Sequence, residues 1–391
     1  MKGALVPMSL ETIARLAGVS RSTVSRVVND DPRVRPAVRE RVLTVISEQD
    51  FHPNAAARSL ASRKTRIIGL LIPGAVSFIF SDPYFPTLIQ GVTDACNADD
   101  LNVMLMMDPS DDPATIDRLY RRVIRGRHID GLVIGTSMID DPLVARMRDD
   151  RFPTVVIGRR PDEPMLSWVD IDNREAARSV VEHLIAHGHR RIGLIGGPRS
   201  VIAAQNRSDG YHDALSAAGI VGDPDMVVDS DFTQAGGAAA MRHLLAVTAG
   251  PPDAVFAASD TMAAGAFTVL AEIGARVPND IALIGFDGLE RHLHTYPTLS
   301  TMAQPITGLA RAAVAMLRRQ IDAPDAPPAH HVLPTFLWRR GSCGCSGPAP
   351  PGSIRYPPGT ATTIDVARYP PSHAEKGGEP VHDHPARPAP V

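Results

Sequence analysis

The sequence predicts an α + α/β protein, in which a small helical N-terminal domain precedes a two-lobed, doubly wound α/β core. Residues 9 to 49 contain three short amphipathic helices, and residues 66 to about 340 alternate apolar runs with helical stretches. That alternation is typical of buried parallel strands covered by helices. The series restarts near Arg191 and holds too many strands for one small sheet, so we expect two similar lobes. A length of 391 residues with 44% hydrophobic residues is enough for several cores.

The first two helices follow from a short apolar pattern interrupted by Gly18. A helix starting near Leu10 carries small and apolar side chains on one face, and Gly18 can end it because glycine adopts the left-handed conformation of a helix stop. The hydroxyl of Ser20 can cap the next helix. In that helix three valines fall within about 100° of arc, opposite two arginines and two serines: Val24, Val27 and Val28 against Arg21, Ser22, Ser25 and Arg26.

The outer face of this second helix carries groups that can read DNA. Arginine can pair with guanine in bidentate fashion in the major groove, and serine can bond a phosphate or a base edge. The pattern is that of a helix-turn-helix, with an ordinary two-helix hairpin as the alternative. Charge favours DNA binding, because residues 1 to 66 carry twelve Lys or Arg and six Asp or Glu, whereas the whole chain has a net charge of −3.

A third helix is predicted over residues 36 to 49, with its apolar side chains packed on the first two helices: Val38, Val42, Val45 and Ile46. The segment 54 to 61 also favours helix, with Asn54 as a good N-cap. About eight residues are too few for a stable helix in water. We therefore expect this segment to become ordered when it packs against a partner, with a plain linker as the alternative.

The core is predicted from runs of alternating type. Candidate strands are Ile67–Ile72, Val103–Met107, Gly131–Ile134, Thr154–Ile157, Ile192–Ile195, Ala254–Ala257 and Ile281–Gly285. Candidate helices include Tyr84–Ala98, Asn173–His187, Gln205–Ala218 and Thr261–Ile273.

Two motifs carry a family resemblance. AGVSRSTVSRVVND, and further on HPNAAARSLASRKTRIIGLLIP, resemble the LacI/GalR family of bacterial transcriptional regulators, and the resemblance runs from about Ser9 to Cys343. It implies a helix-turn-helix DNA-binding domain, a hinge helix with linker, and a two-lobed effector-binding and dimerisation core like periplasmic sugar-binding proteins. We place these parts at residues 8–53, 54–65 and 66–342, with lobe 1 at 66–165 plus 296–325 and lobe 2 at 166–295 plus 326–342.

The resemblance also assigns DNA contacts. Arg21 and Ser22 would discriminate bases, and Arg26 would make a further base or phosphate contact. Leu60 occupies the position of the leucine that the family's hinge helix inserts between central base pairs in the minor groove, which kinks DNA at a cost of a few kcal/mol. The predicted DNA-binding residues are Ser20, Arg21, Ser22, Thr23, Ser25, Arg26, Asn29, Asn54, Arg58 and Leu60.

A polar ligand between two lobes needs an aromatic surface and a few hydrogen-bonding groups at the carboxyl ends of strands. Arg207, expected at the start of a helix after Ile192–Ile195, and Asp287 could together grip sugar hydroxyls or a carboxylate. A surface charge or an interlobe bridge is the alternative for each, and Asp260 is expected to cap a helix at Thr261. The predicted effector-binding residues are Tyr84, Phe85, Arg159, Arg207, Phe232, Asp287 and Gln304.

The sequence departs from the family pattern at two places. The loop GAVSFIFS after the first strand is several residues longer, and its Phe78 and Phe80 could line a cleft, cover it or meet a partner subunit. Gly158 stands where the family has an aspartate, which leaves Arg159 as the polar group. An acidic effector therefore stays open beside a sugar.

Patterns for catalysis and cofactor binding are weak, and we expect no enzyme, no cofactor and no metal site. Gly193 to Pro198 lacks the spacing of phosphate-binding loops, and no G-x-S-x-G elbow occurs. Cys343 and Cys345 lack a second cysteine pair, so they are interpreted as free thiols. His187 and His189 are interpreted as caps on helix carbonyls.

The predicted function is a ligand-responsive DNA-binding regulator, a repressor, that binds a near-palindromic operator as a homodimer, with a tetramer left open. Its effector would be a small polar metabolite such as a sugar. Three cysteines and a weakly apolar N-terminus favour the cytoplasm, with nucleoid association on DNA and no membrane contact. A sugar-binding transport component and an α/β enzyme such as a sugar kinase or hydrolase are the alternatives.

The C-terminal residues 346–391 are rich in proline and poor in large apolar side chains, so we expect them to be disordered. Their histidines, His373, His382 and His384, are sparse and give weak support for metal binding.

Overall fold

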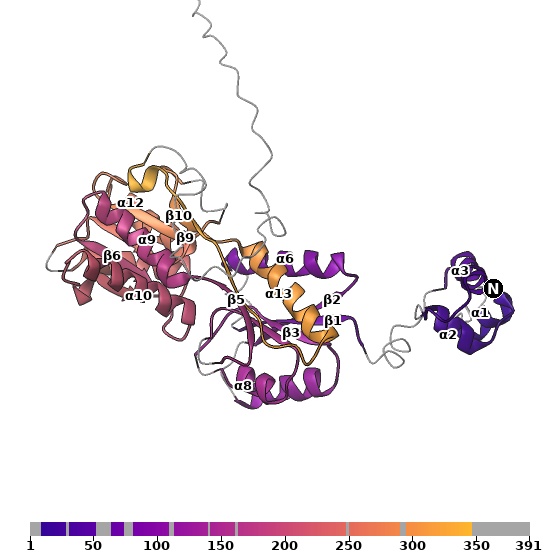
Figure 1. Cartoon of the computed structure of the whole chain (residues 1–391). Coiled ribbons are helices and arrows are strands. Elements are labelled where there is room, and N and C mark those ends of the chain that lie inside the picture. The colour runs from indigo at the N-terminus through magenta and orange to yellow at the C-terminus, as the bar shows by residue number, and fades with distance from the viewer. Residues whose placement is uncertain are drawn as a thin grey trace, which may run out of the picture.

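A computed structural model describes residues 9–28, 31–51, 64–73, 81–108, 113–139, 141–160, 163–247, 250–289 and 295–345 (Figure 1). The predicted hinge segment, the long loop at 74–80 and the C-terminal residues 346–391 lie outside these ranges, so those three predictions are not tested by the structure.

The N-terminal domain consists of α1 (Leu10–Ala17), α2 (Arg21–Val28) and α3 (Pro36–Glu48). The predicted caps are confirmed: Gly18 ends α1 with φ 62°, and the Ser20 hydroxyl accepts a hydrogen bond from the Thr23 N–H at 3.2 Å. The apolar faces meet in one core, to which each helix contributes fully buried side chains: Ile13, Val24 and Val42 among others. The core turns the polar face of α2 outward.

Lobe 1 is built on a six-stranded parallel sheet in the order β11-β5-β4-β3-β1-β2. Its strands are β1 (Ile67–Pro73), β2 (Asn102–Asp108), β3 (Gly131–Ile134), β4 (Thr154–Ile157), β5 (Ser167–Ile171) and β11 (His330–Leu333). One face is covered by α6 (Tyr84–Ala98) and α13 (Ile306–Asp322), and the other by α7 (Pro113–Leu119), the π-helical turn η1 (Tyr120–Arg125) and α8 (Pro142–Asp149).

Lobe 2 repeats this plan with a sheet in the order β12-β10-β9-β8-β6-β7, in which β12 alone is antiparallel to its neighbour. Its strands are β6 (Ile192–Gly196), β7 (Val227–Asp229), β8 (Ala254–Ala257), β9 (Ala282–Asp287), β10 (Ser300–Ala303) and β12 (Phe336–Trp338). The helices are α9 (Asn173–Ala186), α10 (Ile202–Ala217), α11 (Gln234–Leu245) and α12 (Asp260–Glu272), with short 3₁₀ turns η2 (Pro224–Met226) and η4 (Gly341–Cys343).

The predicted lobe boundaries are wrong for three strands. β5 and β11 pair within the lobe 1 sheet, although we expected residues 166–295 and 326–342 in lobe 2. β10 pairs with β9 in lobe 2, although residues 296–325 were expected in lobe 1. The chain therefore crosses between lobes after β5, after β10 and after β11. Short strands carry little pattern of their own, and pairing alone decides which sheet they join.

The length and polarity of the helices show whether any of them could span a membrane. Within the described ranges, every helix is too short or too polar to cross a lipid bilayer.

Candidate DNA-reading and effector-binding sites

The outer face of α2 presents its polar side chains to solvent as predicted. Arg21, Ser22 and Arg26 are exposed, whereas Val24 is fully buried. Arg21 Nε lies 2.7 Å from a carboxylate oxygen of Glu11 on α1. This ion pair joins the polar face of α2 to the first turn of α1.

Hydroxyl groups cluster at the start of α2. The Ser20 oxygen lies 2.8 Å from the Ser22 oxygen and 2.9 Å from the Thr23 oxygen. This arrangement places several donors and acceptors at the positive end of a helix, where phosphate binds favourably. Ser25 is partly buried on the same helix. The remaining predicted DNA-binding residues, Asn29, Asn54, Arg58 and Leu60, lie outside the described residues.

Arg207 is the centre of a buried polar cluster between the lobes. Its Nε donates to Asn173 Oδ1 at 2.9 Å, and its Nη1 donates to the Ala258 carbonyl at 2.6 Å and lies 3.5 Å from Asp287 Oδ1. The guanidinium also lies over the Phe286 ring, 3.7 Å from its centroid. These contacts on every side fix its orientation. The residue lies in the second turn of α10, which begins at Ile202, so the expectation that Arg207 begins this helix is wrong.

The lobe 1 side of the cluster is joined to Arg207 through Asp170 and Asn173. Asp170 accepts hydrogen bonds from the Arg159 N–H at 2.7 Å and from Asn173 Nδ2 at 3.0 Å. A second connection between the lobes is made by Thr261 on α12, whose hydroxyl donates to Asp82 Oδ1 at 3.2 Å. Polar groups of both lobes thus meet at the carboxyl ends of their strands, as expected for this class of fold.

Gln304 and Tyr84 complete the interlobe cluster, which we define as Asp82, Tyr84, Asp170, Asn173, Arg207, Asp260, Asp287 and Gln304. Gln304 Nε2 donates to Asp287 Oδ1 at 2.6 Å. Asp287 has φ 116°, a conformation that non-glycine residues rarely adopt, and strain of this kind is common at ligand sites. Burial raises the pKa of Tyr84, and the nearby Asp287 carboxyl adds to this effect.

Negative groups outnumber positive ones in this cluster. Its four carboxyl groups, at Asp82, Asp170, Asp260 and Asp287, are each at most 5% exposed. Burial raises the pKa of Asp170 to about 6 and that of Asp260 to about 7, and it raises the pKa of Asp287 further above its ordinary value. Burial lowers the pKa of Arg207, an effect opposed by Asp287 and its neighbours. Shared protons, or a ligand that donates hydrogen bonds, can satisfy these carboxyls.

Three predicted effector residues lie apart from this cluster. Phe85 is buried in the core that includes α6, where its ring meets Tyr84 edge-on at 5.2 Å. The Arg159 side chain lies against Asp172 and over Trp168, with its backbone alone touching Asp170. Phe232, at φ 62°, packs its ring on Gly197. The structure thus brings together Tyr84, Arg207, Asp287 and Gln304 from the predicted set.

Asp260 does not cap α12, contrary to the expectation. Ser259 is the N-cap, and its hydroxyl accepts from the Met262 N–H at 3.1 Å. Asp260 instead accepts a hydrogen bond at 2.8 Å from the N–H of Leu289, two residues after Asp287. The cluster members Asp170 and Asn173 were not predicted, because β5, which contains Asp170 and ends two residues before Asn173, was not predicted from the sequence.

Comparison with known proteins agrees with this arrangement. Residues 9–54 match the model of the bacterial regulatory proteins of the lacI family, and residues 181–343 match that of the periplasmic binding protein-like domain. The regulator CelR of Thermobifida fusca is 38% identical over 337 residues, which cover 85% of this chain and 98% of CelR.

The chain belongs to the LacI family. As a member, it is a DNA-binding transcriptional regulator with an effector-binding core. The ribose operon repressor of Haemophilus influenzae is 33% identical over 319 residues, covering 81% of this chain and 93% of that repressor.

Solved structures of the family have the same fold. A complex of CelR with cellobiose superposes with a TM-score of 0.67 at 36% identity, over 86% of this chain and 99% of that one. The Lac repressor dimer bound to operator and the anti-inducer ONPF gives a TM-score of 0.75 at 26% identity, with the same coverage.

Asp260→Asn should flatten the dependence of stability on pH. An acid whose pKa is higher in the folded chain than in the unfolded chain stabilises the fold at low pH, and this contribution is lost as pH rises through the folded value, here about 7. Chemical denaturation should show the free energy of unfolding falling by about 1–3 kcal/mol between pH 5 and pH 8, and falling less in the variant.

Asp280→Asn is the matched control. Hydrogen bonds from Arg276 lower the pKa of Asp280 to about 2, so this carboxylate stays ionised throughout the window and its loss should leave the slope unchanged. Parallel slopes for the wild type and Asp260→Asn would contradict the assignment.

Proposed function

We propose that the protein is a repressor that binds a near-palindromic operator as a homodimer, and that a neutral sugar of the cellobiose type controls this binding. The observation that carries the proposal is the interlobe cluster, in which hydrogen bonds from Asn173 to Asp170 and from Thr261 to Asp82 join the two lobes. Arg207 lies beside them, held by Asn173 and Asp287. Its groups are those that bind sugar hydroxyls: carboxyl and amide oxygens accept, and guanidinium and amide nitrogens donate.

Charge favours a neutral effector over an acidic one. An acidic ligand would add a negative charge beside Asp82, Asp170 and Asp287, whose pKa values are already raised by burial. Sugar hydroxyls can instead donate to these oxygens without desolvating a charge. The similarity to CelR, which is known in complex with cellobiose, gives the sugar its proposed identity.

The position of the cluster supports a coupling to lobe movement. Asp170 and Asn173 lie on either side of the crossover after β5, and Gln304 lies on the crossover after β10. A ligand that pulls on these residues acts on the segments about which the lobes rotate. A ligand that prefers one lobe angle by about 1–3 kcal/mol would shift the population of chains able to bind the operator.

The chain would act by binding and not by catalysis, and its affinity for DNA should depend on salt. Each phosphate neutralised by Arg or Lys releases a counterion, so log K should fall linearly with log salt. A dimer with two α2 helices matches a two-fold symmetric site. Analytical ultracentrifugation at working concentration would distinguish the proposed dimer from a tetramer.

The test uses fluorescence anisotropy of the full chain on an operator chosen by selection from random duplexes. Cellobiose should change the operator Kd at least about fivefold, whereas ribose and glucuronate should not. A response to glucuronate alone would reject the neutral-sugar proposal, and an affinity blind to sequence and salt would reject the operator proposal. Cleavage of cellobiose by the purified protein would support the enzyme alternative.

Leu60→Ala should weaken specific binding more than nonspecific binding. This prediction rests on the family resemblance, by which Leu60 is inserted between base pairs at the centre of the operator. Competition between operator and random duplex measures the ratio, and equal losses on both would contradict insertion.

A further inference from the structure

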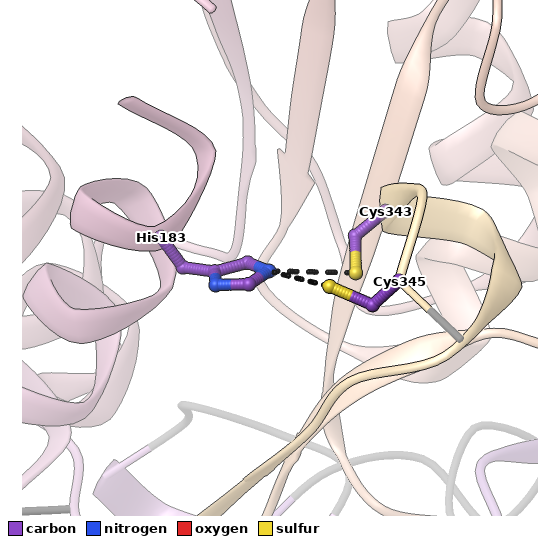
Figure 2. Close-up of side chains that lie close together, drawn as sticks. All are labelled: His183, Cys343 and Cys345. Carbon is purple, nitrogen blue, oxygen red and sulfur yellow. Dashed lines mark hydrogen bonds between the residues drawn. The ribbon is translucent and has the colours of Figure 1, made fainter. Parts of the chain in front are cut away.

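Three side chains with metal-binding atoms converge at the end of lobe 2 (Figure 2). His183 lies on α9, whereas Cys343 and Cys345 lie on the turn that follows β12, far away in the sequence. His183 Nε2 is 3.4 Å from Cys343 Sγ and 3.7 Å from Cys345 Sγ. Figure 2 shows the imidazole and both sulfur atoms directed toward one another.

A fourth group joins from the same helix. His187 lies four residues after His183, so both rings project from one side of the helix, with their centroids 4.5 Å apart. His187 Nε2 is 3.4 Å from Cys345 Sγ. His187 also caps the helix as expected, since its backbone N–H donates to the His183 and Leu184 carbonyls. The His189 N–H likewise donates to the Leu184 carbonyl, and its Nδ1 lies 3.5 Å from Asp253.

The cysteine turn is held in place independently of the sulfur contacts. The Ser342 hydroxyl donates to the Leu283 carbonyl at 2.5 Å and accepts from the Ser300 N–H at 2.7 Å, which fixes the turn to β9 and β10. Gly344 has φ 84°, and the Cys345 N–H donates to the Arg340 carbonyl at 3.2 Å. This left-handed glycine turns the chain so that both sulfurs face α9.

We propose that His183, Cys343 and Cys345 bind one Zn²⁺ ion, and that the His187 ring, which contacts Cys345, moves toward them to complete a tetrahedral set of ligands. With Zn–N near 2.0 Å and Zn–S near 2.3 Å, the N–S edges of such a site are about 3.6 Å. Three N–S distances, 3.4, 3.7 and 3.4 Å, match these edges, and the ligand atoms of His183, Cys343 and Cys345 all lie within 4.8 Å of one another. Two imidazoles and two thiolates are a ligand set typical of structural zinc. Both thiols lose their protons on binding, and the resulting charges balance the ion.

A zinc ion bound here would fix the C-terminal end of the core to α9. The residues after β12 follow the third crossover between lobes, and zinc would tie them to α9, whose first turn contributes Asn173 to the interlobe cluster. This inference does not depend on the identity of the effector. The test measures metal binding and stability and not DNA binding. The zinc site can therefore be rejected or supported separately from the proposed function.

The experiment titrates the full chain, reduced and stripped with chelator, with Co²⁺ and then Zn²⁺. One equivalent of Co²⁺ should give the intense visible bands of a tetrahedral site and a thiolate-to-cobalt charge-transfer band, both bleached by one equivalent of Zn²⁺. Zinc should also raise the thermal midpoint by several degrees, and chelator should reverse this.

Variants assign the ligands. Cys343→Ser and His183→Gln should each weaken zinc binding by more than about tenfold. His187 is exposed, so His187→Gln should fold normally and still lose affinity. Cys96→Ser, a buried thiol of lobe 1, should bind as the wild type does. A triple substitution of the tail histidines, His373→Ala, His382→Ala and His384→Ala, should also retain the charge-transfer band.

Several results would overturn the proposal. The absence of a charge-transfer band under reducing conditions would mean hydrogen-bonded thiols only. Loss of the metal in the tail variant would place binding at the tail histidines. Unchanged affinity in His187→Gln would remove that histidine from the site and reject the four-ligand geometry.

Discussion

Arg21→Ala should reduce operator affinity by about 30-fold or more, because a bidentate contact of arginine with a base is worth about 1–3 kcal/mol and a dimer makes it twice. Arg21 lies on the exposed face of α2 with a side chain 68% exposed, and its partner in the free protein is Glu11 at 2.7 Å. The lost contact should appear mainly as lost discrimination between operator and random DNA. Anisotropy with both duplexes measures this ratio.

Two variants control this prediction. Glu11→Gln frees Arg21 from its partner and removes a negative charge near DNA, so it should strengthen operator binding by a few-fold at low salt. Arg276→Ala removes an exposed arginine from the core, where it pairs with Asp280, and should leave affinity unchanged. A uniform loss on operator and random DNA in Arg21→Ala would mean that Arg21 contacts phosphate and not a base.

Arg207→Met should lower effector affinity by at least about tenfold and destabilise the core, most strongly at high pH. Each hydrogen bond from a charged donor to the ligand is worth about 1.5–3 kcal/mol. Removing one partner of a buried ion pair costs about 3–5 kcal/mol, because the partner carboxylate is left uncompensated. Without Arg207, Asp287 and Asp170 must take up protons, which is easy at pH 5 and unfavourable at pH 8.

Isothermal titration with cellobiose and denaturation at both pH values measure the two effects. Arg199→Met is the matched control, because Arg199 is an exposed arginine of the same lobe that pairs with Asp229. Asp287→Asn removes one carboxyl and keeps an oxygen for Gln304, so it should weaken the effector response with less loss of stability. Equal destabilisation of Arg207→Met at pH 5 and pH 8 would contradict the charge argument.

Elements fixed by neighbouring residues could be predicted from the sequence, whereas those fixed by distant pairing could not. The pattern around Gly18 predicted α1 and α2 because capping and a helical period act within a few residues. Strands such as Gly131–Ile134 and Ala254–Ala257 were predicted to the residue, since buried parallel strands are continuous apolar runs. β10, with Ser300 and Thr301 buried in its four residues, has no such run, and its membership of lobe 2 follows from pairing with β9.

The sequence by itself determined the helix-turn-helix, the family and the presence of Arg207 and Asp287 in the core, because each is carried by a contiguous motif. Tertiary structure decided which groups meet. Asp170 and Asn173 join Arg207 because the chain crosses lobes between them and α10 packs beside α9. His183 and Cys343 lie 160 residues apart and meet through the return of the chain after β12. Helix and strand formation depends on residues close together in the sequence. Pairs such as these form only when the sheets and helices pack against one another.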